Sequence, residues 1–158
     1  TRPEVLCALA WGLLYCVIWV TGGRMNGDDA MRSWQLAPLA ALKEAPLSTL
    51  WSIHTQPPLW NATIAALLQL APTHLSVATQ ILMIASGGLL CACTYRIAFS
   101  FGVPRRIAFT LAFVGTMSSA LLASGFSIRY ELPVAALLAL LCSVAALPMI
   151  EPARTWRG

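Results

Sequence analysis

Residues 75–95 read LSVATQILMIASGGLLCACTY, an apolar run without a charged side chain. About 20 such residues cross the roughly 30 Å hydrocarbon layer of a bilayer as a helix. The stretch therefore predicts a membrane-spanning helix. Within it, Gly87-Gly88 suits close contact with another helix, and Gln80 is expected to form a hydrogen bond between helices.

Apolar runs of similar character lie on both sides of this stretch. Three of them reach the lower limit of about 17 residues for a tilted or well-packed span. They cover residues 5–21, 107–124 and 132–150. A fifth run, 59–71, is too short to span and is expected to lie in the interface or to re-enter between the other helices. The predicted fold class is all-α: a polytopic membrane protein with about four transmembrane helices and amphipathic juxtamembrane helices in the first outer loop.

The amino-acid composition is typical of a protein embedded in a lipid bilayer. Hydrophobic residues make up 58% of it, charged residues 10%, and the mean hydropathy is +0.73. A soluble globular domain carries about 25% charged residues. The chain starts at Thr1 and ends on a basic tail, so we expect residues 1–158 to be a single membrane domain from a longer protein.

The distribution of charge predicts the orientation, because cytoplasmic ends of spans collect Lys and Arg. With the N-terminus inside, the cytoplasmic side holds Arg2, Arg96, Arg105, Arg106, Arg154 and Arg157. The outer side holds Arg24, Arg32, Lys43 and Arg129, together with Asp28, Asp29, Glu44 and Glu131. The net charge of +4 is therefore not a uniform basic coat, which argues against nucleic-acid binding. We expect a multi-pass protein of the bacterial inner or plasma membrane.

The outer loop 22–74 is too long and too patterned for a simple connector. Asp28 and Asp29 stand where a short helix would start, and Pro38 limits that helix to about two turns. A second short helix is expected to begin at Pro46, and a third near Pro58, since proline suits the first helical position. The apolar face of the third is predicted to carry Trp60, Ile64, Leu67, Leu68 and Ala71, with Asn61 and Gln69 away from it.

This layout resembles a known family. The match is carried by Asp28-Asp29-Ala30-Met31, by Gln56-Pro57-Pro58-Leu59-Trp60 and, more loosely, by Ser127-Ile128-Arg129-Tyr130. These segments are similar to motifs in the N-terminal part of polyprenyl-phosphate-sugar-dependent glycosyltransferases of the GT-C superfamily. Protein O-mannosyltransferases and lipid A aminoarabinose transferases are branches of it. The resemblance does not determine the branch of the superfamily, and so it does not determine which sugar is transferred.

The resemblance implies transfer of a sugar from a polyprenyl-phosphate donor, with inversion, to a hydroxyl of a glycan, lipid or protein acceptor. Such a reaction needs a base for the acceptor proton and stabilisation of the leaving phosphate. By the likeness, Asp28 is the candidate general base, and Asp29 is the alternative or a supporting partner. The candidate substrate-binding residues are Arg32, His54, Gln56 and Arg129. No residue is assigned as a metal ligand. Some branches of the superfamily use a divalent cation and others do not, so the resemblance does not decide whether this chain needs one.

Simpler roles compete with each assignment. An aspartate ahead of a short helix commonly caps it. His54 on an apolar face fits interfacial packing, and Arg129 fits pairing with Glu131. For the chain as a whole, a transporter or flippase piece and a noncatalytic membrane scaffold are the alternatives. A transporter usually places ionisable groups near the bilayer midplane, and these spans hold almost none.

The cysteines fall inside the predicted spans, where cysteine usually acts as a small packing residue. They are Cys7, Cys16, Cys91, Cys93 and Cys142. The spacing of Cys91 and Cys93 points their side chains to different helix faces.

Overall fold

The computed structural model describes residues 2–21, 36–53, 57–117 and 130–146. These residues form seven α-helices and no strand, which confirms the all-α prediction. The helices are α1 (Pro3–Val20), α3 (Leu39–Glu44), α4 (Pro46–Ser52), α5 (Pro58–Leu70), α6 (Leu75–Ser100), α7 (Arg105–Thr116) and α9 (Glu131–Ala145).

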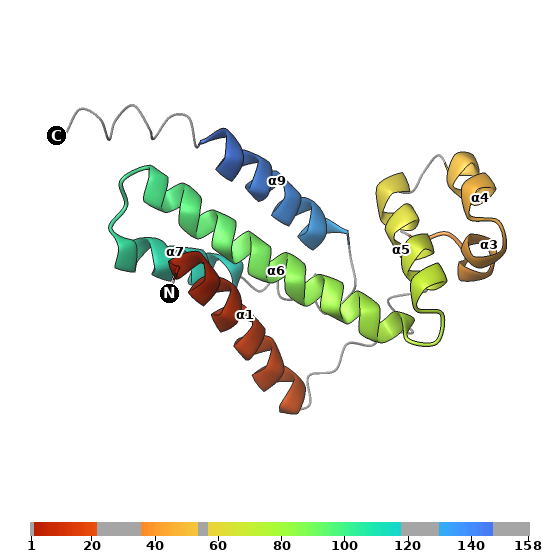
Figure 1. Cartoon of the computed structure of the whole chain (residues 1–158), viewed down its shortest axis with the longest axis horizontal. Coiled ribbons are helices and arrows are strands. Elements are labelled where there is room, and N and C mark those ends of the chain that lie inside the picture. Colours follow the sequence, from red (N-terminus) through yellow and green to blue (C-terminus); the bar gives the residue numbers. More distant parts are fainter. Residues whose placement is uncertain (1, 22–35, 54–56, 118–129, 147–158) are drawn as a thin grey trace.

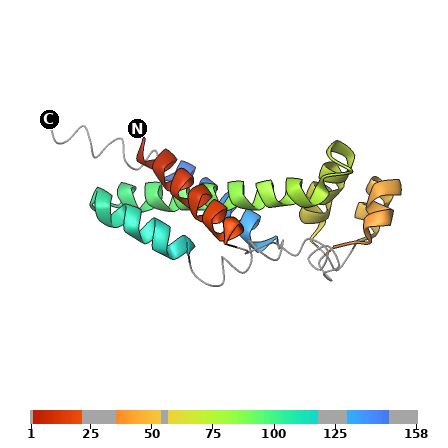
Figure 2. The same ribbon diagram turned by 90° about the horizontal axis from the view of Figure 1, so that it is seen from below.

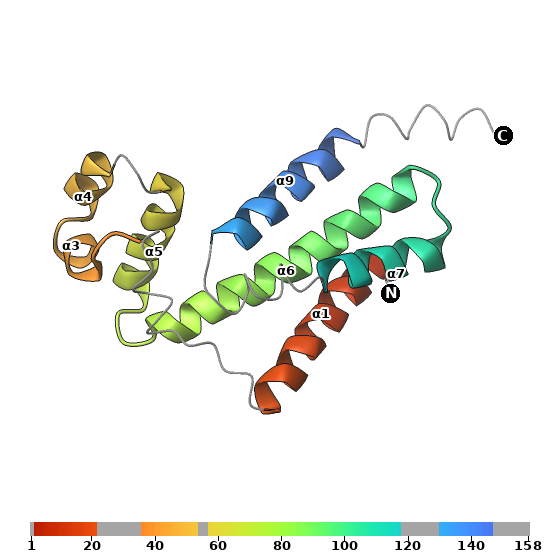
Figure 3. The same cartoon turned by 180° about the vertical axis from the view of Figure 1, so that it is seen from behind.

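Helix α6 is the axis of the molecule (Figure 1). Its most extensive contacts are with α1, α9 and α7, which together with α6 form a bundle. Figure 3 shows the same helix from behind, with α1 and α9 on its two sides and α7 beside its C-terminal half. The apolar runs on either side of α6 thus form α1, α7 and α9, and each of these helices buries part of its surface against α6.

Small residues bring α1 and α6 into close contact, as the Gly87-Gly88 pair predicts. A Cβ atom at Gly87 would overlap the indole of Trp11, which is fully buried. Gly88 faces the backbone of Ala8, whose Cα would lie 3.6 Å from such a Cβ. The prediction for Gln80 is wrong, because its Nε2 donates to Ser76 Oγ (3.4 Å) within α6.

Only α6, among the described residues, is both long and apolar enough to cross a membrane. The apolar stretches Pro3–Ile18 within α1 and Glu131–Ala145, which is α9, are shorter. Helix α6 starts at Leu75 as predicted but continues past residue 95 to Ser100. Arg96 does not end it, since arginine is a good helix former. The predicted runs 107–124 and 132–150 extend beyond the described residues.

A tight turn reverses the chain between α6 and α7. Gly102 has φ 83°, a left-handed conformation that glycine adopts without steric cost. The amide of Gly102 donates to Phe99 O (3.1 Å), and that of Val103 donates to Ala98 O (3.2 Å), which satisfies carbonyls at the end of α6. Pro104 then precedes α7. The N-terminal end of α7 therefore lies beside the C-terminal end of α6.

The outer helices α3, α4 and α5 lie at the opposite end of α6 (Figure 2). Helices α4 and α5 begin at Pro46 and Pro58, as predicted. Helix α3 is an additional element that the sequence did not predict. Side-chain hydrogen bonds tie the three together: Thr49 Oγ1 donates to Ala41 O (3.0 Å), and Gln69 Nε2 donates to Lys43 O (3.3 Å).

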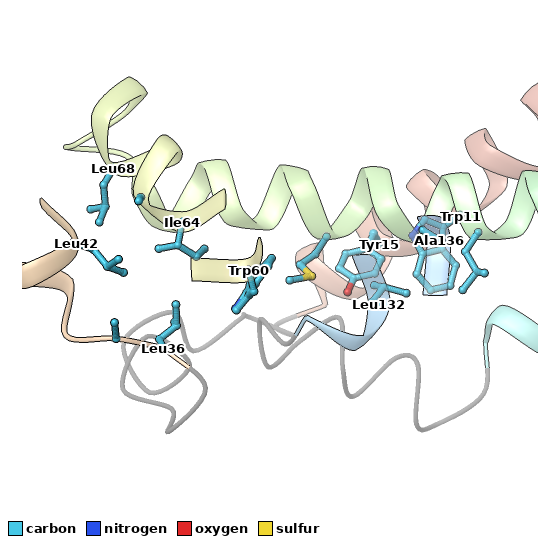
Figure 4. Packing of buried hydrophobic residues seen from close by; sticks show 13 residues of the cluster. Trp11, Tyr15, Leu36, Leu42, Trp60, Ile64, Leu68, Leu132 and Ala136 are labelled. Carbon is cyan, nitrogen blue, oxygen red and sulfur yellow. The ribbon is translucent and has the colours of Figure 1, made fainter. Parts of the chain in front are cut away.

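One buried apolar cluster runs through both parts of the molecule (Figure 4). Trp11, Tyr15 and Leu132 belong to its bundle side, and Ile64 and Leu42 to its outer side. Figure 4 shows Trp60 of α5 between these two groups. The outer helices are thus packed onto the bundle through α5.

Two cysteines of α6 face different neighbours, as their spacing predicts. Cys91 contacts Cys7 of α1, and Cys93 contacts Ser143 of α9. All three of these cysteines are buried and free. The packing role expected of cysteine does not extend to Cys16 and Cys142, which are exposed.

Candidate functional site

All six residues singled out for chemistry lie outside the described residues. They are Asp28, Asp29, Arg32, His54, Gln56 and Arg129. Their proposed roles therefore stay predictions. Two described residues follow them directly in the chain: Pro57 after Gln56, and Tyr130 after Arg129. Both of these neighbours line the same cleft.

This cleft lies between α5, α6 and the start of α9 and has a volume of about 330 Å³. The side chains of its wall are mostly apolar. They include Leu59 and Trp60 from α5, Leu82, Ala85 and Leu89 from α6, and Val134, Ala136 and Leu137 from α9. The polar groups of the lining are Thr63, Ser86 and Tyr130. A cavity of this size is at the lower end of the roughly 300–1,000 Å³ typical of small-molecule sites.

Trp60 lines the cleft and carries a buried hydrogen-bond donor. Its side chain is buried, and its indole Nε1 has no hydrogen-bond partner among the described residues. A buried donor without a partner is unfavourable by about 1–3 kcal/mol. The sequence places Trp60 at the end of the Gln56–Trp60 motif, but does not mark its indole as a free donor.

Asn61 fixes the position of α5. It is fully buried, although the sequence predicts it away from the apolar face of α5. Its Oδ1 accepts a hydrogen bond from the backbone amide of Ala37 (2.7 Å), and its Nδ2 donates to Pro57 O (3.0 Å). The prediction is wrong because an amide side chain satisfies buried backbone groups that periodicity along α5 does not reveal. Asn61 thus joins Pro57 at the cleft to the chain ahead of α3.

The arrangement suits an apolar ligand with a polar end. The cleft wall favours an aliphatic chain, since burying apolar surface is worth about 25 cal/mol per Å². The polar end would lie toward Pro57 and Tyr130, where the chain continues into the predicted substrate-binding residues. In the part of the chain that the structure describes, no group of three or more possible metal-ligating side chains occurs.

The chain matches no protein-family model, no curated protein and no solved structure.

Proposed function

We propose that this chain is the donor-side catalytic part of an integral-membrane glycosyltransferase. It transfers a sugar from a polyprenyl-phosphate donor to an acceptor hydroxyl with inversion. The observation that carries the proposal is the apolar cleft between α5, α6 and α9. Its wall includes Pro57, Leu59 and Trp60, which belong to the segment that resembles the glycosyltransferase motif. An apolar cleft at that segment gives an isoprenoid tail a place beside the predicted polar site.

The surface of the bundle supports a membrane setting. Large apolar side chains are exposed along α1, α6, α7 and α9, among them Leu9, Leu13, Ile81, Leu111 and Leu141. Soluble monomers rarely expose contiguous apolar patches of more than a few hundred Å². In a bilayer these side chains would face lipid. Helix α6 has the length and hydropathy of a span.

The charged residues support the proposed orientation. Tyr95, Arg105 and Arg106 line one hollow with Pro3, so the end of α6 near Arg96 and the N-terminal end of α1 near Arg2 lie together. Tyr130, next to Glu131, lies at the cleft with α5. Most of the described arginines thus lie at one end of the bundle, together with Glu4, and Glu131 lies toward the other. An excess of arginine at one end is expected of a span with a cytoplasmic basic end.

In the proposed mechanism Asp28 takes the proton of the acceptor hydroxyl as that oxygen attacks the anomeric carbon. Asp29 supports it or replaces it in this role. The polyprenyl phosphate leaves from the opposite face, which inverts the configuration. Arg129, Arg32 and His54 would bind its phosphate, since guanidinium groups bind phosphate bidentately. Gln56 is the remaining candidate for contact with substrate.

The test of the mechanism is sugar transfer by the full-length protein in proteoliposomes with polyprenyl-phosphate-sugar donors. We expect Asp28→Asn to lower kcat by roughly 10²–10⁴-fold, the usual contribution of a general base. Glu44→Gln is the matched control, because Glu44 is an exposed carboxylate at the end of α3. Retained turnover in Asp28→Asn would refute the assignment of Asp28 as the general base.

A second substitution tests phosphate binding. We expect Arg129→Ala to raise the KM for the donor, and an unchanged KM would mean that Arg129 has a structural role.

The test of the cleft uses two residues of α9. Val134 lines the cleft, and Leu138 is exposed on the same helix outside that lining. We expect Val134→Trp to raise the donor KM about tenfold by displacing on the order of 50 Å² of apolar contact. Leu138→Trp should leave KM unchanged. Equal effects of the two substitutions would exclude the cleft as the isoprenoid site. Donor binding that depends on Asp28 would also separate an enzyme from a transporter or a scaffold.

A further inference from the structure

A second hollow lies at the opposite end of the bundle, between α1, α6 and α7. Its volume is about 500 Å³. Its wall includes Leu6, Tyr95, Arg105, Arg106, Phe109 and Thr110. The wall therefore combines two cationic groups with apolar side chains, unlike the cleft at α5.

The electrostatics of this hollow favour an anion. Arg105 and Arg106 are the first two residues of α7, and both are exposed. The amides in the first turn of a helix lack intrahelical partners and point outward, and no side chain caps this end of α7. Of the described residues near this end, Glu4 is the acidic one and Arg2 and Arg96 are further cations. Of these cations, Arg105 and Arg106 line the hollow, so their charges and the helix dipole act on the same space.

Tyr95 provides evidence for a ligand that is independent of the charges. It lines the hollow and is 1% exposed, and its ring stacks on Phe99 with centroids 6.0 Å apart. Its hydroxyl is buried and has no hydrogen-bond partner among the described residues. Buried hydroxyls are normally hydrogen-bonded, so this one lacks an acceptor. A phosphate oxygen is such an acceptor.

The apolar part of the wall shows what kind of phosphate compound fits. Leu6 and Phe109 line the hollow, and Ile107 and Leu111 are exposed next to it on α7. An ion such as free phosphate gains nothing from these side chains. A lipid gains apolar contact for its acyl chains while its headgroup meets the arginines.

We propose that this hollow binds the phosphate group of an anionic phospholipid of the cytoplasmic leaflet. Arg105, Arg106 and the first turn of α7 hold the phosphate, and the Tyr95 hydroxyl donates to it. The acyl chains lie along Leu6 and Phe109. The inference rests on the membrane setting of the proposed function, but not on sugar transfer.

The experiment measures the thermal stability of the full-length protein in neutral detergent, titrated with phosphatidylglycerol or phosphatidylcholine. We expect stabilisation by phosphatidylglycerol alone, and we expect it to fade at high salt. Arg105→Gln and Arg106→Gln should each weaken the apparent affinity about fivefold. Arg96→Gln is the matched control, since Arg96 is exposed at the same end outside the described lining. It should change the affinity less than twofold.

Tyr95→Phe separates binding from structure. Since the hydroxyl has no protein partner, the substitution should not lower the stability without lipid, but it should weaken the response to phosphatidylglycerol several-fold. An effect of Arg96→Gln as large as that of Arg105→Gln would overturn the proposal. So would equal stabilisation by the two lipids, or the same stabilisation by millimolar inorganic phosphate, which would indicate a site for the free ion.

Failure of this inference differs from failure of the proposed function. Asp28→Asn should lower the kcat of sugar transfer by roughly 10²–10⁴-fold and keep the preference for phosphatidylglycerol. Intact transfer without that preference would overturn the lipid site alone. Release of the protein from membranes by carbonate would overturn both.

Discussion

The two ends of α6 differ in how the chain leaves them. At the basic end a tight turn at Gly102 connects α6 to α7. At the other end the neighbouring segment folds into α3, α4 and α5. It packs onto the bundle through Trp60 of α5, and Asn61 ties α5 to the backbone ahead of α3. One end is thus a single tight turn, and the other carries three helices with their connections next to an apolar cleft. Binding and catalytic residues are expected on the latter kind of element.

The largest effect is expected from removing the centre of the bundle. Trp11→Ala deletes a fully buried indole and should lower the free energy of unfolding by about 3–5 kcal/mol. Trp51→Ala is the control, because Trp51 in α4 is 89% exposed. Thermal or denaturant unfolding in detergent measures both. If the two substitutions lowered the free energy of unfolding equally, α4 would depend on Trp51 as strongly as the bundle depends on Trp11.

The next effect concerns the close contact of α1 with α6. Gly87→Ala would push a methyl group into the Trp11 indole and should cost up to about 3 kcal/mol. Gly12→Ala is the matched change, since a Cβ there would meet nothing within 4 Å. It should be neutral or stabilising by up to about 1 kcal/mol, because alanine favours a helix over glycine. A neutral Gly87→Ala would contradict the described packing.

A smaller and more local effect is expected at Asn61. Asn61→Ala leaves the buried Ala37 amide without its acceptor, at a cost of about 2 kcal/mol. Hydrogen exchange should accelerate in residues 36–53 and stay slow in the middle of α6. Thr63→Ala is the control, since among the described residues the Thr63 hydroxyl donates within α5, to Leu59 O. Uniform acceleration across the chain would show that the outer helices and the bundle unfold together.

The smallest effect is expected at the turn. Gly102→Ala forces a side chain into a left-handed conformation and should cost about 1 kcal/mol. Unfolding in detergent reports this loss, and Gly115→Ala, in open space on α7, is its control. If Gly102→Ala also weakens the response to phosphatidylglycerol, the turn positions α7 for lipid binding. An unchanged response would limit its role to stability.

The sequence predicts the helices better than it predicts their contacts. Long apolar runs and the prolines at 46 and 58 mark local preferences, and helices lie at the positions that these signals predict. Of the described helices, however, only α6 is long and apolar enough to span a membrane. Helix α3 has six residues and no capping side chain, so its sequence carries little signal. Asn61 was misplaced because its partner, Ala37, is 24 residues away. The predicted catalytic and substrate-binding residues lie outside the described residues, so they rest on motif resemblance.

The length of α6 determines how well the helix would match the thickness of a membrane. Its 26 residues extend about 39 Å at the α-helical rise of ~1.5 Å per residue. In a bilayer with roughly 30 Å of hydrocarbon, a rod of that length tilts or protrudes. Hydrophobic mismatch would then change the tilt of α6, and with it the height of α5 above the lipid. The proposed sugar transfer should accordingly vary with the acyl-chain length of the host membrane.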